Sequence, residues 1–170
     1  MRKWMVMLFI GPGLFFIFYW LLTQGNTDVP IPKTPLPKSY KLSGQMVAAQ
    51  NGRIKAGLSG RTILIEDLVI GNNNRVMVEA GKVFLVIPVF TDSFTPGIKD
   101  FELIDARGIK YLPLEVKEEY IAQATRISKD TVPKNMSVLY LLFKVKMDVE
   151  EYYLLLHDGT KDIAWYFNLK

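Results

Sequence analysis

Residues 138–147 read VLYLLFKVKM, and this stretch decides the fold class. Apolar side chains occupy every second position: Leu139, Leu141, Phe143, Val145 and Met147. Lys144, Lys146 and Asp148 occupy the alternate positions toward the end of the stretch. A period of two is the pattern of a β-strand with one buried and one wet face. The stretch therefore predicts a strand in an antiparallel sheet.

The neighbouring stretches extend the β pattern in both directions. Two further strands are predicted over residues 152–156 and 163–169, joined by a turn at Asp158 and Gly159. Upstream, strands are predicted over 45–58, with a hairpin turn at Asn51-Gly52, over 61–70 and over 82–90. Pro88 cannot donate to a sheet ladder, so the last of these strands should lie at a sheet edge or bulge there. About seven strands separated by short turns predict a mainly β fold, a β-sandwich.

Residues 101–114 (FELIDARGIKYLPL) form the clearest hairpin, with a type I turn at residues 105–108 that Gly108 closes. Residues 115–129 break the β pattern. Val116, Tyr120, Ala124 and Ile127 recur at helical spacing, with acids at the start and bases at the end. One short helix is therefore expected within the sandwich domain.

Residues 4–22 (WMVMLFIGPGLFFIFYWLL) contain no charged residue. A helix of this length spans roughly 28 Å, close to the hydrocarbon thickness of a bilayer. Arg2 and Lys3 favour a cytoplasmic N-terminus, and Trp4 and Trp20 suit the two membrane interfaces. The alternative is a signal peptide cleaved after Gly25, which would give a secreted protein that starts at Asn26.

Residues 23–44 follow this segment and include the run VPIPKTPLPK. Closely spaced prolines favour an extended polyproline II conformation, which is typical of a semi-rigid stalk. The expected organisation is a transmembrane anchor over residues 1–22, a proline-rich stalk over 23–44 and an extracytoplasmic β-sandwich domain over 45–170.

The charge and cysteine content exclude several classes of function. The net charge is +4, to which Arg2 and Lys3 contribute two, and no run of five basic residues occurs. A nucleic-acid partner is therefore not expected. The chain has no cysteine, so it forms no disulfide and offers no thiol for catalysis or lipid attachment. An extracytoplasmic domain without disulfides favours a Gram-positive type of envelope.

Three motifs resemble a known family, the immunoglobulin-like domains of unknown function found in secreted, lipid-anchored or membrane-anchored proteins of Gram-positive bacteria. This family is related to a secreted mycobacterial antigen domain. Its hairpin pattern stands here as Phe101, Leu103, Asp105, Gly108 and Tyr111. A long apolar strand stands at residues 83–90, and a proline-led turn at Pro133 precedes the strand at 138–145. The resemblance implies an immunoglobulin-like sandwich outside the membrane, and it carries over no catalytic residue.

Candidates for catalysis or metal binding are few. His157 is the single histidine, so it cannot build a zinc site of the usual kind, and a partly exposed position at a turn is expected for it. Five carboxylates offer a weak alternative as a Ca²⁺ site, although they match no calcium-loop spacing. They are Asp148, Glu150, Glu151, Asp158 and Asp162. We expect no catalytic residue, no metal and no cofactor, and an enzyme is the least favoured reading.

Aromatic residues in the last two predicted strands are the better lead. Tyr152, Tyr153 and Tyr166 are candidates for an interaction surface, and alternation should turn Tyr153 and Tyr166 away from the core. The expected function is a non-enzymatic, single-pass membrane module that recognises an envelope protein or component. One alternative is a structural subunit of a multi-protein envelope complex, and another is a secreted sandwich protein after cleavage near Gly25.

Overall fold

The strand predicted over residues 138–147 is β10 (Ser137–Lys146), and it pairs along its whole length with β7 (Lys82–Thr91). The computed structural model describes residues 33–59, 61–70, 74–125, 127, 132–159 and 161–170, which belong to one folded unit, Lys33–Lys170. The predicted span over residues 4–22, with Trp4 and Trp20, lies outside the described residues. Among the described residues, no helix is both long enough and apolar enough to cross a membrane.

Sheet B is formed in the order β10-β7-β3-β2, with β3 (Gly52–Ala56) and β2 (Met46–Ala49) joined as the predicted hairpin. A further short strand, β4 (Ile63–Ile65), pairs with β7 beyond the end of β3. Because β10 pairs with the whole of one side of β7, β3 and β4 share its other side.

Pro88 lies in the middle of β7, a central strand, so the expectation of an edge position or a bulge in this strand is wrong. Its register with β10 is continuous, and its carbonyl accepts a hydrogen bond from the Gly57 N–H at 2.8 Å. In any other residue the backbone N–H would point to the same side as this carbonyl. Pro88 needs no such donor, because β3 has ended and β4 has not begun at this position. The gap that accommodates Pro88 therefore lies between the neighbouring strands β3 and β4, and β7 itself is continuous.

Sheet A is formed in the order β1-β12-β11-β8-β9. Its members are β1 (Lys41–Leu42), β12 (Asp162–Asn168), β11 (Glu151–His157), β8 (Phe101–Asp105) and β9 (Lys110–Tyr111). Only β1 runs parallel to its neighbour, and β8 and β9 are the predicted hairpin. A 3₁₀ turn, η2 (Ile98–Asp100), leads into β8.

The main core lies between the two sheets. Alternate residues of β7, β10, β11 and β12 point into it, as the sequence pattern predicted, and Phe143, Tyr152 and Trp165 are its largest side chains. Trp165 Nε1 also donates to the carbonyl of Gln45 at 3.1 Å, where the chain passes from β1 of sheet A to β2 of sheet B. This contact ties one open side of the sandwich to its core.

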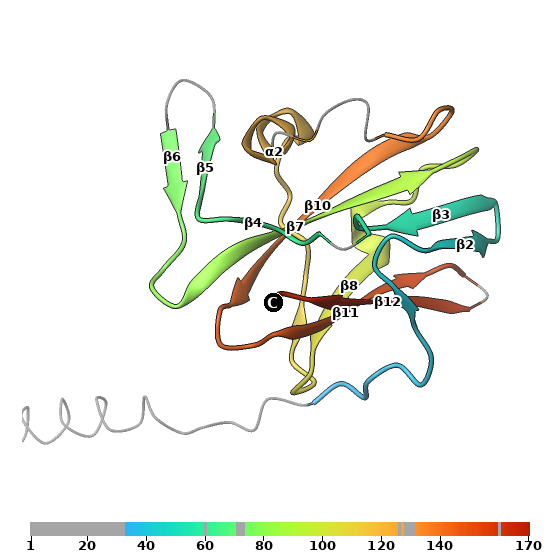
Figure 1. Cartoon of the computed structure of the whole chain (residues 1–170), viewed down its shortest axis with the longest axis horizontal. Helices are drawn as coiled ribbons and strands as arrows, with labels where there is room; N and C mark the ends of the chain where they lie inside the picture. The colour runs from blue at the N-terminus through green and yellow to red at the C-terminus, as the bar shows by residue number, and fades with distance from the viewer. Residues whose placement is uncertain (1–32, 60, 71–73, 126, 128–131, 160) are drawn as a thin grey trace, which may run out of the picture. The chain divides into compact units, whose positions relative to one another are not determined.

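The sequence pattern predicted that the second face of β10 is exposed to solvent. This prediction is wrong, because Tyr140 and Leu142 are buried there. They contribute to a second core on the outer side of sheet B, covered by α2 (Glu118–Thr125) and by the hairpin of β5 (Asp67–Ile70) and β6 (Asn74–Met77). Figure 1 shows α2 and this hairpin on the side of sheet B that faces away from sheet A. The predicted helix exists but is shorter than expected, and Ile121 is its most deeply buried apolar residue.

The described residues contain twelve strands, so the expectation of about seven is wrong. The stretch predicted as one strand over residues 61–70 is split at Glu66 into β4 and β5, because β4 joins sheet B and β5 joins the separate hairpin. The mainly β sandwich with one α-helix in the described part of the chain is confirmed.

Residues 33–40, which we call the strap, belong to the folded unit although they were predicted as stalk. The Thr34 N–H donates to the carbonyl of Gly108 at 2.8 Å, at the edge of sheet A formed by β8 and β9. The strap ends at β1, on the opposite edge of that sheet. In Figure 1 it runs as a light-blue segment along the side of sheet A that faces away from sheet B.

Candidate functional site

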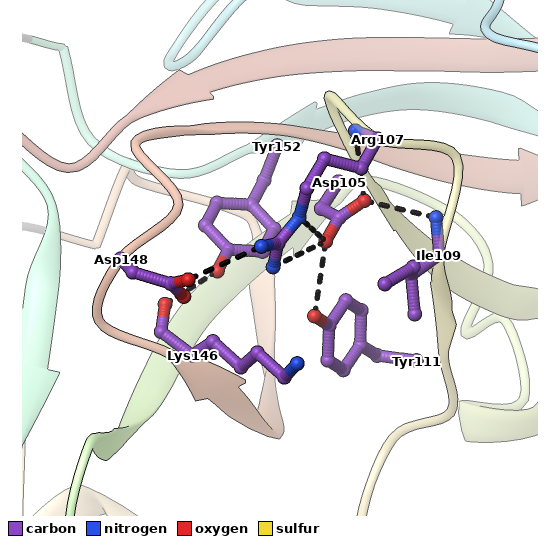
Figure 2. Close-up of polar contacts among 7 residues, drawn as sticks. All are labelled: Asp105, Arg107, Ile109, Tyr111, Lys146, Asp148 and Tyr152. Carbon is purple, nitrogen blue, oxygen red and sulfur yellow. Dashed lines mark hydrogen bonds and ion pairs between the residues drawn. The ribbon is translucent and has the colours of Figure 1, made fainter. Parts of the chain in front are cut away.

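The hairpin motif Asp-x-x-Gly-x-x-Tyr places a buried carboxylate, Asp105, at the end of β8. Asp105 Oδ1 accepts the backbone N–H groups of Arg107 and Ile109, each at 2.9 Å. Asp105 Oδ2 accepts the Tyr111 hydroxyl at 3.1 Å and the Arg107 guanidinium at 3.3 Å. Figure 2 shows these groups converging on one carboxylate, with Arg107 reaching on to Asp148.

This arrangement is suited to holding a turn and not to chemistry. Asp105 is 0% exposed, and both of its oxygens are hydrogen-bonded. Burial, followed by the nearby Asp105 carboxylate, raises the pKa of Tyr111 to about 12. The phenol therefore stays protonated as a donor over the physiological range. Gly108 adopts φ of 82°, and a side chain there would collide with the strap at the Thr34 carbonyl.

Tyr152 is not a surface residue, so its assignment to an interaction surface is wrong. It is 0% exposed and lies in the core between the sheets, in edge contact with the ring of Tyr111. Its hydroxyl donates to the carbonyl of Lys146 at 2.8 Å, six residues upstream, where the chain crosses from β10 to β11. Burial raises the pKa of Tyr152 well above its ordinary value, which keeps this donor protonated. Tyr152 and Leu154 are two residues apart on β11, so both side chains point into the core.

Tyr153 and Tyr166 do point away from the core, as alternation predicted. They face each other across β11 and β12 on the outer side of sheet A, and their ring centroids lie 5.5 Å apart. Tyr40, from the end of the strap, lies 5.3 Å from the Tyr153 ring and 5.5 Å from the Tyr166 ring. We call these three residues the tyrosine cluster. Tyr153 is almost buried, whereas Tyr40 is 48% exposed, so the cluster presents mainly Tyr40 and Tyr166 to solvent.

His157 is exposed at the end of β11, as expected. Its Nδ1 lies 2.8 Å from Asp162 and its Nε2 lies 3.3 Å from Glu102, which also pairs with Lys110 at 2.7 Å. The hydrogen bond with Asp162 raises the pKa of His157, and partial burial opposes this effect. Among the described residues, the ring contacts the carboxylates of Asp162 and Glu102, an arrangement typical of a surface ion-pair network.

The five acidic residues considered for Ca²⁺ do not form one group. Asp148, Glu150 and Glu151 lie at the start of β11, and Asp158 and Asp162 lie beyond its end, roughly 20 Å away at strand spacing. Several already have partners in the folded unit: Arg107 for Asp148, Lys170 for Glu150, Tyr166 for Glu151 and His157 for Asp162. Within the described part of the chain, no group of His, Cys, Asp or Glu could hold a metal ion.

A cleft of about 640 Å³ adjoins the tyrosine cluster, because Tyr166 lines both. It lies between β4 of sheet B and the β1 and β12 side of sheet A. Its apolar lining comes from Leu42, Leu58, Leu64 and Leu169, and its charged lining from Arg61 and Lys170. Leu42 is 54% exposed and Leu64 is 41% exposed, so large apolar side chains face the open cleft.

Sequence reasoning missed Tyr40, Leu64 and Arg61. Tyr40 follows a proline-rich run that reads as stalk, and its position became clear only with the pairing of β1 to β12. Leu64 lies in a stretch that was predicted only as a strand, and its exposure follows from its position at the open cleft.

The comparisons with known proteins concern the fold. No protein-family model matches the chain, and no curated protein matches it. A conserved hypothetical protein from Bacillus anthracis is similar in structure, with a TM-score of 0.50 at 12% identity, over 75% of this chain and 99% of that one. An uncharacterized β-sandwich protein from Clostridium difficile 630 matches with a TM-score of 0.44 at 14% identity, over 82% of this chain and 100% of that one. The first of these likenesses supports the overall fold, and neither neighbour has a described activity.

Proposed function

We propose that the folded unit is a non-enzymatic binding module that recognises a protein partner in the cell envelope through the tyrosine cluster. The tyrosine cluster is the observation that carries this proposal. Its rings contact one another at 5.3–5.5 Å, and Tyr40 and Tyr166 keep their outer sides open to solvent. Tyrosine combines a large apolar ring with a polar tip and is enriched among the residues that dominate binding energy at protein interfaces.

The sandwich is proposed to be immunoglobulin-like. Support comes from Tyr152, which lies near the start of β11 and donates its hydroxyl to the backbone at Lys146, six residues upstream. This resembles the tyrosine corner of immunoglobulin-like sandwiches, in which a tyrosine at the start of a strand bonds back across a corner between sheets.

The module is proposed to lie outside the cell membrane of a Gram-positive type envelope, anchored by residues 4–22 with the N-terminus in the cytoplasm. The uncharged apolar run and the flanking Arg2 and Lys3 support this arrangement. A reporter that is active only outside the membrane should work when fused after Lys170, and a cytoplasmic reporter should not. Reversed activities would contradict the orientation. A mature N-terminus at Asn26 would instead support a secreted protein.

Photo-crosslinking in cells tests the binding surface. A benzophenone amino acid at Leu42, which is exposed beside the cluster, should give a discrete adduct with one protein. The matched control is the same amino acid at Met77, an exposed apolar position on β6 of the separate hairpin. Combining the Leu42 probe with Tyr40→Ala and Tyr166→Ala should remove the adduct. An adduct that is equally strong at Met77, or that survives both tyrosine substitutions, would rule out the tyrosine cluster as the binding surface.

A further inference from the structure

The outer edges of sheet B at β10 and at β4 differ in whether another segment bonds to them. On the β10 side, the Leu114 N–H donates to the carbonyl of Leu142 at 2.7 Å, so a passing segment occupies part of that edge. On the other side, Ile63 and Ile65 of β4 face Val86 and Phe84 of β7. The Pro88 carbonyl points to this side of β7, and the backbone groups of every second residue in a strand point to the same side. Phe84 and Val86 therefore direct their N–H and C=O groups toward β4. The pairs that they form with Ile65 and Ile63 are the hydrogen-bonded pairs.

Leu64 therefore directs its backbone N–H and C=O away from β7, to the outer side of β4, and Leu64 is also a lining residue of the cleft. Among the residues that the structure describes, no strand pairs with β4 on that side. An edge of this kind is a ready template for another extended chain. The Leu64 side chain, 41% exposed, lies in the lining of the same cleft. The cleft thus offers backbone hydrogen-bonding groups and apolar surface together.

The charged side chains that line the cleft are both basic. Its lining contains Arg61 and Lys170 and no acidic residue. Lys170 pairs with Glu150 at 2.5 Å, so its charge is already compensated. The Arg61 guanidinium has no ion pair or hydrogen bond with any residue in the described ranges. A segment that enters the cleft should therefore place a carboxylate near Arg61.

We infer that the cleft binds an extended segment of the protein partner that carries alternating apolar residues and a carboxylate, and that this segment adds as a strand to β4. Its backbone bonds to Leu64, one apolar side chain enters between Leu42 and Leu58, and its carboxylate pairs with Arg61. Strand addition derives affinity from main-chain hydrogen bonds and specificity from alternate side chains. The inference rests on the proposed function and deepens it, because Tyr166 lines both the cleft and the tyrosine cluster.

Selection from a displayed library of random heptapeptides tests the inference with the full chain in detergent. The wild-type chain should enrich peptides with alternating β-branched or apolar residues and at least one Asp or Glu. Arg61→Glu should lower the affinity of the selected peptides at least about ten-fold and should enrich Lys or Arg in a new selection. Lys134→Glu is the matched control, since Lys134 is exposed in the loop before β10, and it should leave both results unchanged.

Methylation of backbone nitrogens in a selected peptide separates strand addition from side-chain binding. A methyl group on the nitrogen that bonds to Leu64 should abolish binding, whereas methylation of the adjacent nitrogens should have little effect. Absence of any enrichment, enrichment that ignores Arg61→Glu, or tolerance of methylation at every position would overturn the inference. The crosslink at Leu42 reports separately on the proposed function: if it persists while the library yields nothing, the partner is bound by the tyrosine cluster without strand addition.

Discussion

The hairpin turn around Asp105 and the cleft beside β4 each contain an arginine next to polar groups, yet they differ in how completely those groups are paired. In the turn, the carboxylate of Asp105 accepts two backbone N–H groups, a phenol and a guanidinium. In the cleft, the Arg61 guanidinium has no ion pair or hydrogen bond within the described residues, and no described strand pairs with the outer side of β4 at Leu64. A buried and fully paired network stabilises a fold, whereas exposed unpaired groups beside apolar side chains are free to bind. The turn therefore serves stability, and the cleft is the better candidate for recognition.

Replacing the central carboxylate of the turn should have the largest effect. Asp105→Ala leaves two partly buried backbone N–H groups and the Tyr111 hydroxyl without their acceptor and the Arg107 guanidinium without its buried partner, and it should lower the free energy of unfolding by about 3–5 kcal/mol. Arg61→Ala in the cleft should change it by less than about 0.5 kcal/mol. Urea unfolding of the full chain, followed by tryptophan fluorescence, measures both. Similar losses for the two variants would show that the division between stability and recognition is wrong.

Removing one hydroxyl from each region gives a finer comparison. Tyr111 and Tyr166 both donate to a carboxylate, at 3.1 Å to the buried Asp105 and at 3.2 Å to the exposed Glu151. Tyr111→Phe should cost about 1.5–3 kcal/mol, because the acceptor is charged and buried. Tyr166→Phe should cost less than about 0.5 kcal/mol, because water replaces the lost donor. The same unfolding measurement applies, and a larger loss for Tyr166→Phe would contradict the assignment.

Tyr40→Ala tests whether the strap is held by the tyrosine cluster. Loss of two aromatic contacts, one of them with the almost buried Tyr153, should lower stability by about 1 kcal/mol. It should also speed hydrogen exchange at the Thr34 N–H, which bonds to Gly108. Leu36→Ala is the control, since Leu36 is exposed on the same strap. Unchanged exchange at Thr34 would mean that the two ends of the strap are held independently.

The smallest expected effect concerns pH. Asp162 and Glu102 face His157, and Lys110 compensates Glu102 from β9. The pKa of His157 is raised in the folded chain, so its stabilising contribution is fully present below its unfolded pKa and is lost as pH rises through the folded value. Stability should therefore be a few tenths of a kcal/mol lower at pH 8 than at pH 6, because the site is exposed. His157→Gln should abolish this difference, and an unchanged pH dependence in that variant would assign it to another group.

The sequence predicted those features that depend on local patterns. Alternation correctly turned Phe143 inward and Tyr166 outward, and Gly108 marked the hairpin turn. It could not predict the neighbours of a strand, which depend on pairing between distant residues. Pro88 was predicted at a sheet edge or a bulge, since the gap between β3 and β4 that accommodates it lies some thirty residues upstream and leaves no local signal. The burial of Tyr140 and Leu142 likewise required the position of α2.

The strap has a mechanical consequence if the chain is held at its N-terminus and binds a partner through the tyrosine cluster, as we propose. A pulling force between the N-terminus and the tyrosine cluster would first load the Thr34 to Gly108 hydrogen bond and the contacts of Tyr40, because they precede every strand of the described residues. Residues 34–40 would then peel from the sheet before either core is strained, and this segment measures roughly 23 Å at full extension. We expect single-molecule stretching to show this short extension as a separate step at low force, ahead of the rupture of the sandwich. The strap would in that case act as a reserve of length between an anchored chain and its moving partner.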